Sequence, residues 1–238
     1  GDTIRVSLTE DPEFEIPVCR DMVQRYTNRH MHTPVSVEAY NDLPLPYDPF
    51  TYKRRETIQV QKTGGHNVPV VVAALQRPEN ITREDLADTG YRYDAATDKW
   101  NIGDAAADFI YTGNRLPGFA LPGTLQVICD YDHWKTLENK DGIYPLIQAD
   151  NIKKELLPSP DQIYFLEADA EKDQSFLSYI AAYPQAVLCL KSSNLHAMAS
   201  VRRLLAELVS RSIKNPVILI VESAAASVDE QLIHFATE

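Results

Sequence analysis

Three carboxylates that follow apolar runs are the residues of this 238-residue chain best placed to do chemistry. Glu167 and Asp169 end the run QIYFLEAD, and Glu222 ends the run PVILIVE. If these runs are parallel strands, their carboxyl ends share one sheet edge, where open α/β folds bind ligands. Carboxylate oxygens suit Mg²⁺, so the three residues form a candidate metal site. The alternative is that these side chains are solvated or cap the helices that follow.

The last third of the chain also resembles the Toprim domain of the type VI topoisomerase A subunit and of its meiotic recombination relatives. In that family a glutamate ends the first strand, two arginines open a helix, and the last strand ends in Asp-x-Asp. Glu167 matches the glutamate, Ser200–Leu205 the arginine helix, and Glu222–Ala224 the acidic pair. Because alanine cannot bind a metal, the resemblance implies a Toprim-like phosphoryl-transfer or nuclease-type enzyme whose metal site is absent or degenerate.

A second cluster, Asp130, Asp132 and His133, follows another apolar run. Alternation along a strand would place the two aspartates on one face, an arrangement that permits a metal. The alternative is a polar turn. The sequence has no Walker loop, dinucleotide fingerprint or nucleophile elbow, so no catalytic residue is predicted.

A proline- and aromatic-rich arm covers about residues 41–52. Its prolines exclude a helix and interrupt strand pairing, so the arm is expected to be extended. Tyrosine and proline bury contact area at low entropic cost, which is typical of segments that contact a neighbouring chain. The candidate interaction residues are Leu43, Pro44, Pro46, Tyr47, Pro49, Phe50 and Tyr52. The alternative is a loop that packs on its own domain.

Strand and helix patterns alternate in the last third of the chain. Three apolar runs are separated by helical patterns, which predicts a three-strand parallel α/β unit at residues 161–238. Residues 1–160 are predicted to be a β-rich mixed region with one hairpin across 56–75 and a second across 91–102. The predicted fold class is therefore α/β (α+β overall), with a domain boundary near residue 160.

Composition, net charge and cysteine content indicate what kind of protein this is. The chain has 44% hydrophobic residues and lacks an apolar run of roughly 18 residues, so we expect a soluble protein without a membrane segment. Its net charge of −11 argues against nucleic acid as a partner. Three widely spaced cysteines predict a reducing, intracellular (cytoplasmic) location. Because the chain begins with Gly1 rather than methionine, we expect it to be either a trimmed form of the protein or a piece of a longer polypeptide.

The incomplete catalytic sets favour a non-enzymatic structural or interaction protein. On this hypothesis the chain self-associates or binds a protein partner and needs no cofactor. The alternative hypothesis is the metal-dependent, Toprim-like enzyme, with Mg²⁺ held by Glu167, Asp169 and Glu222.

Overall fold

The computed structural model describes most of the chain, and the chain divides into two compact units. The units are residues 1–42 and 43–238. The described residues are 5–7, 9, 11–27, 48, 50–51, 53–76, 80–149, 159–172, 174–191 and 197–220.

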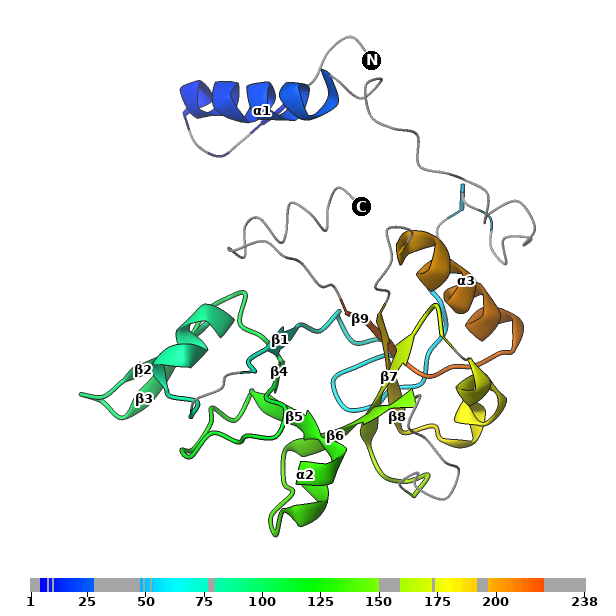
Figure 1. The fold of residues 1–238 in the computed structure, drawn as a ribbon. Coiled ribbons are helices and arrows are strands. Elements are labelled where there is room, and N and C mark those ends of the chain that lie inside the picture. Colours follow the sequence, from blue (N-terminus) through cyan, green and yellow to red (C-terminus); the bar gives the residue numbers. More distant parts are fainter. Residues whose placement is uncertain are drawn as a thin grey trace. The chain divides into compact units, whose positions relative to one another are not determined.

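The larger unit is built on one seven-stranded parallel sheet (Figure 1). In spatial order the strands are β1 (Val72–Ala74), β4 (Phe109–Tyr111), β5 (Gln126–Asp130), β6 (Ile143–Gln148), β7 (Tyr164–Asp169), β8 (Ala186–Lys191) and β9 (Val217–Leu219). Every neighbouring pair is parallel, and the spatial order follows the order along the chain. The predicted α/β class is confirmed, including the three parallel strands of the last third.

Helices and 3-10 turns connect these strands, as parallel pairing requires. They are η3 (Glu84–Thr89), α2 (Tyr131–Thr136), η6 (Ser175–Ser178), η7 (Ile180–Ala182) and α3 (Ala197–Ser210). In α3 the buried leucines Leu204 and Leu208 recur with helical spacing and face the sheet. The Arg211 guanidinium pairs with Glu207 at 3.0 Å on the exposed side, as the i,i+4 spacing predicts.

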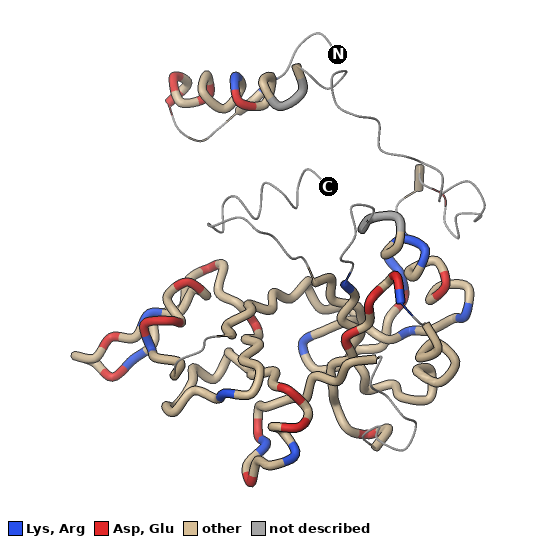
Figure 2. The backbone as a smooth tube through the Cα atoms, viewed as in Figure 1, with Lys and Arg blue, Asp and Glu red and all other residues tan. Residues whose placement is uncertain are grey.

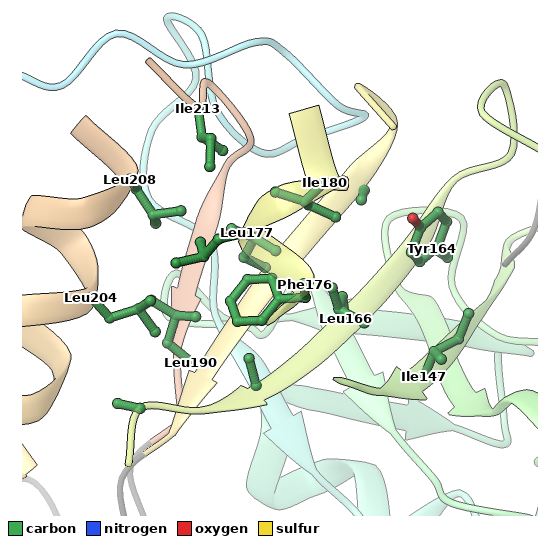
Figure 3. Packing of buried hydrophobic residues seen from close by; sticks show 14 residues of the cluster. Ile147, Tyr164, Leu166, Phe176, Leu177, Ile180, Leu190, Leu204, Leu208 and Ile213 are labelled. Carbon is green, nitrogen blue, oxygen red and sulfur yellow. The ribbon is translucent and has the colours of Figure 1, made fainter. Parts of the chain in front are cut away.

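One face of the sheet packs against α3 and the η6–η7 segment. Figure 3 shows Leu204 and Leu208 of α3 pointing toward Leu190 of β8, with Phe176 and Leu177 beside them. Because these strands are covered, their runs are apolar throughout rather than alternating. At the β1 side of the sheet, a further cluster holds Leu86 of η3, Tyr91 and Ile110.

The other face of the sheet has a core of its own, dominated by aromatic rings. Phe109, Tyr144 and Phe165 come from three different strands and meet edge to face or tilted, with ring centroids 5.5 to 6.3 Å apart. Val60 joins this core from the segment that precedes β1, and Arg55 of that segment donates to the carbonyl oxygen of Ile213 at 2.8 Å. The segment at 53–71 is thereby tied to the chain just before β9.

One of the two predicted hairpins is confirmed and the other is wrong. β2 (Tyr91–Asp94) and β3 (Lys99–Ile102) pair antiparallel, and the rings of Tyr93 and Trp100 contact across them, 5.1 Å apart. The hairpin predicted across residues 56–75 does not form, because β1 pairs in parallel with β4 instead. The run VPVVVAAL is apolar without alternation, which suits a parallel sheet better than a hairpin.

The predicted domain boundary near residue 160 stays a prediction. β6 and β7 lie on either side of that position and pair directly, from Leu146 opposite Phe165 to Gln148 opposite Glu167. The strands on both sides of the predicted boundary therefore belong to one sheet.

The smaller unit contains η1 (Pro12–Phe14) and α1 (Glu15–Thr27). Pro12 is the first residue of this short 3-10 turn. A backbone N–H at that position would have no partner within the turn, so proline fits there without losing a hydrogen bond. Val18, Met22 and Val23 recur with helical spacing along α1, and all three are exposed within the described residues.

Candidate functional site

A cavity of about 1100 Å³ lies between the two edge strands of the sheet. Residues of β1 and of β9 both line it, so the seven-stranded sheet curls until its edges face one space. Its apolar lining includes Val68, Val70, Val72, Ile128, Leu146, Ile218 and Ile220, and its polar lining includes Arg54, Asn67, Gln76, Tyr111, Gln148, Glu167 and Lys191.

The polar side chains come from the carboxyl ends of successive strands. Tyr111 ends β4, Gln148 ends β6 and Lys191 ends β8, while Glu167 lies two residues before the end of β7. Each belongs to the strand face that carries the aromatic core, because side chains two residues apart point the same way. The carboxyl end of a curled parallel sheet is where barrel enzymes place their sites.

Glu167 and Lys191 form an ion pair inside this cavity. The Lys191 ammonium donates to Glu167 Oε1 at 2.6 Å. The lysine side chain is 29% exposed and the glutamate side chain 10% exposed. The pair joins neighbouring strands β7 and β8 at their carboxyl ends. The Glu167 carboxylate thus has its cationic partner within the protein itself.

Tyr111 and Asp130 form a second polar pair, one that joins β4 to β5. The Tyr111 hydroxyl donates to Asp130 Oδ1 at 2.7 Å. Burial raises the pKa of Tyr111, and its hydrogen bond to the Asp130 carboxylate raises that pKa further. Tyr111 is therefore a neutral hydrogen-bond donor at physiological pH rather than a base.

Two buried thiols lie near these pairs. Burial, and then the charge of Asp130, raise the pKa of Cys129 from 9.0 to about 11. Burial, and then the charge of Glu167, also raise the pKa of Cys189, which lines the cavity. Since the thiolate is the nucleophile and the metal ligand, both residues are inert thiols near neutral pH.

These raised pKa values predict that the protein loses stability in alkaline solution. Between pH 9 and 11 the folded chain keeps the Cys129 proton and the unfolded chain releases it. Because the unfolded state then binds fewer protons, the free energy of unfolding falls as pH rises, by up to about 1.4 kcal/mol per pH unit for each such group. Denaturant titrations at several pH values measure this slope.

Cys129→Ala is the matched variant for the alkaline loss. It removes one of the titrating groups, so its free energy of unfolding should fall less steeply between pH 9 and 11. An unchanged slope in this variant would mean that Cys129 titrates alike in the folded and unfolded chains.

The predicted metal site is described only in part. Glu167 and Asp169 are both buried at the end of β7, but they have separate partners. Glu167 pairs with Lys191, whereas Asp169 Oδ1 accepts the N–H of Glu171 at 3.0 Å and shapes the turn after the strand. Glu222 lies outside the described residues. Among the described residues, no three His, Cys, Asp or Glu side chains lie close enough to hold a metal ion.

The second acidic cluster is not brought together on one face. β5 ends at Asp130, and Asp132 belongs to the helix α2, where it pairs with Lys135 at 2.7 Å. The expected alternation fails because the strand ends between the two aspartates. The polar-turn alternative describes Asp132 better, while Asp130 belongs to the cavity side of the sheet.

The proline-aromatic arm lies almost entirely outside the described residues. Of its candidate interaction residues only Phe50 is described, and its side chain is 96% exposed. The Asp48 carboxylate accepts the N–H of Phe50 and the hydroxyl of Thr51, both at 2.9 Å. The role of the arm in contacts stays a prediction.

Sequence reasoning missed Tyr111, Gln148 and Lys191 as residues of the cavity. Each follows an apolar run at the position where a strand gives way to a loop. The signal was present as a polar residue two positions after an inward-facing apolar one. To use this signal one must know where each strand ends, and the sequence alone did not give the ends of the strands accurately enough.

Charged residues of both signs occur along the described part of the larger unit. Figure 2 shows Lys and Arg interspersed with Asp and Glu along the larger unit. That nucleic acid is no partner stays a prediction from the net charge of −11. Within the part of the chain that the structure describes, no helix has the length and apolar character needed to cross a membrane.

Comparison with known proteins finds relatives that share one name. The chain is 27% identical to a protein of Bacteroides fragilis over 218 residues and 28% identical to one of Bacteroides thetaiotaomicron over 229 residues. Each alignment covers 92% of this chain, and 30% and 31% of the respective relative. A protein of Porphyromonas gingivalis is 42% identical over 74 residues, which are 31% of this chain and 12% of that protein.

Each of these relatives is named 4-hydroxy-3-methylbut-2-en-1-yl diphosphate synthase (flavodoxin). The chain spans about 30% of the length of the first two relatives. No protein-family model and no solved structure matches the chain.

The names of the relatives correct the functional prediction. The expectation of a non-enzymatic interaction protein or oligomer is wrong, because the relatives are named as an enzyme. The Toprim-like nuclease alternative is wrong as well, because the name denotes the synthesis of a diphosphate. Incomplete catalytic sets misled the prediction, since a chain that spans about 30% of an enzyme need not contain its catalytic set.

The expected absence of a cofactor, with Mg²⁺ for the alternative enzyme, is also wrong. The finding that overturns it is the name of the relatives, which couples their activity to flavodoxin. The described residues supply no ligand set for a metal-containing group, since no three His, Cys, Asp or Glu side chains converge among them.

Proposed function

We propose that this chain forms one part of a 4-hydroxy-3-methylbut-2-en-1-yl diphosphate synthase that works with flavodoxin. The observation that carries the proposal is that the alignments with the two Bacteroides synthases cover 92% of this chain. It therefore spans the parallel sheet and the cavity rather than one short motif.

The described residues suit a supporting part of such an enzyme. The polar pairs of the cavity, Glu167 with Lys191 and Tyr111 with Asp130, are already satisfied by each other. Because the described residues hold no ligand set for a redox group, we place that group in a part of the synthase outside them. On this proposal the chain positions other parts of the enzyme and does not itself accept electrons.

Flavodoxin is the protein partner that this proposal implies for the whole synthase. We also propose an intracellular location for the chain, as the sequence predicts. The three cysteines are free, with Cys129 and Cys189 buried, which suits a reducing compartment.

An exchange experiment tests the proposal. In the Bacteroides fragilis synthase, the matched segment is replaced by residues 1–238 of this chain. The exchange protein is then expressed in a bacterial strain depleted of its own synthase. We expect 4-hydroxy-3-methylbut-2-en-1-yl diphosphate to be formed and growth to be restored. The same synthase without the segment, or with an unrelated α/β domain of similar size, should form none.

Two results of this experiment would contradict the proposal. A soluble exchange protein with the circular dichroism of an α/β fold but no product would contradict it. If the exchange protein is insoluble, the natural polypeptide that carries residues 1–238 is expressed in the same strain. Failure of that soluble polypeptide to form the product would also contradict the proposal.

A further inference from the structure

The curled sheet has a gap between its two edge strands. β1 has β4 as its partner and β9 has β8, and within the described residues neither strand has a partner on its second side. Val72 and Ala74 of β1 line the same cavity as Val217 and Leu219 of β9. The cavity therefore separates two strand edges that face each other across the opening.

The backbone of β9 presents hydrogen-bonding groups to this gap. The N–H of Leu188 donates to the Pro216 carbonyl oxygen, and the N–H of Ile220 donates to the Leu190 carbonyl oxygen, both at 2.8 Å. Residues 216 and 220 thus direct their backbone toward β8. Because backbone groups alternate along a parallel strand, Val217 and Leu219 direct theirs toward the gap.

The backbone of β1 follows the same rule. The carbonyl oxygen of Val71 accepts the N–H of Phe109 at 3.2 Å, and the N–H of Leu75 donates to the carbonyl oxygen of Tyr111 at 2.8 Å. By alternation, Val72 and Ala74 direct their N–H and C=O groups away from β4 and toward the gap. A strand placed in the gap would find donors and acceptors on both sides.

Large apolar side chains are exposed beside the same opening. Val68 is 79% exposed, Val71 58% and Leu219 47%, and all three line the cavity. An exposed strand edge flanked by apolar side chains is a template for pairing, which folded proteins normally cover.

We propose that the gap between β9 and β1 receives an eighth parallel strand, supplied by the part of the synthase that this chain does not span. The proposal rests on the proposed function for the source of the strand. The strand should be a short run of apolar residues without proline, because in a closed parallel barrel both of its faces are buried. Eight parallel strands close a barrel whose interior side chains fill it.

The order of the sheet favours this occupant. Each of the seven strands lies beside the one that precedes it in the sheet, in chain order and in parallel. Right-handed crossovers add each new strand on the same side, so the next strand of this series belongs at the free edge of β9. The relatives are about three times as long as the matched segment, which leaves ample chain to supply it.

A second copy of this chain fits the gap less well. Two copies related by a twofold axis would join their β9 edges antiparallel. Such a contact would satisfy β9 alone and leave β1 without a partner, whereas one parallel strand satisfies both edges.

Peptide binding followed by hydrogen exchange tests the proposal. Overlapping peptides of about fifteen residues, long enough to hold a whole strand, are made to cover the unmatched length of the Bacteroides fragilis synthase. Each is added to this chain, and amide exchange is followed by mass spectrometry. We expect one peptide to slow exchange at Val72, Ala74, Val217 and Leu219 together, by about tenfold or more.

Two substitutions at one position separate strand pairing from simple apolar contact. Leu219→Pro and Leu219→Ala both remove the exposed side chain, but only proline removes the N–H that faces the gap. Thermal unfolding of both variants checks that the chain still folds. We expect Leu219→Pro to weaken binding of the protecting peptide by about tenfold more than Leu219→Ala does.

Three results would overturn the proposal. The first is that no peptide protects both edges, and the second is that the proline and alanine variants bind the peptide equally. The third is protection that appears without peptide as the chain is concentrated, because a second copy would then be the occupant. Formation of product in the exchange experiment is scored independently, so the strand proposal and the synthase proposal can fail separately.

Discussion

Replacing Lys191 by methionine is expected to lower the free energy of unfolding by about 3 kcal/mol. The substitution keeps most of the apolar stem and removes the ammonium that donates to Glu167 at 2.6 Å. The Glu167 carboxylate, only 10% exposed, then stays in the cavity without its partner. An unpaired charge at such a site loses its solvation without compensation. Urea titration at neutral pH measures the loss.

Glu167→Gln is the matched control for this effect. Removing the carboxylate leaves Lys191, which is 29% exposed and can turn its flexible stem toward water. We therefore expect this variant to lose only about 1 kcal/mol. The double variant, Glu167→Gln with Lys191→Met, should recover most of the loss caused by Lys191→Met. Equal losses for the two single variants would show that the carboxylate is as well solvated as the ammonium.

Replacing Phe165 by alanine is expected to lower the free energy of unfolding by about 3 to 5 kcal/mol. Phe165 is 1% exposed and its ring contacts those of Phe109 and Tyr144 from two other strands. Alanine would leave a cavity where three strands meet, and the edge-to-face contact with Phe109 would be lost as well. Thermal or urea unfolding of the purified chain measures the change.

Phe50→Ala is the control that separates burial from residue type. Phe50 is 96% exposed, so removal of its ring should change the free energy of unfolding by less than about 0.5 kcal/mol. A loss for Phe50→Ala comparable to that of Phe165→Ala would show that the arm packs against the larger unit. A small loss for Phe165→Ala would show that the aromatic core adapts to the missing ring.

Much of the fold follows from local patterns in the sequence. The apolar faces of α3 and the antiparallel pair of β2 with β3 depend on neighbours a few residues apart, and both are confirmed. The hairpin predicted across residues 56–75 failed because its second run pairs with β4, more than thirty residues farther along the chain. Local spacing carries no information on such a partner.

The candidate site was predictable only in part. Glu167 stood out because a charged residue ended an apolar strand, and the structure places it in the cavity. Its partner Lys191 belongs to the next strand and was missed, since only the register of β7 against β8 brings the two together. Asp130 was noted for its neighbour Asp132, whereas its contact is with Tyr111 on β4.

The sequence by itself determined the α/β class and the parallel character of the last three strands. These depend on the period and length of apolar runs, which every segment carries within itself. The tertiary structure decided that the sheet has seven strands, that it curls, and that its edges enclose one cavity. Curl and register arise from the packing of distant segments against each other. For that reason the polar residues that meet in the cavity were visible only once the sheet was assembled.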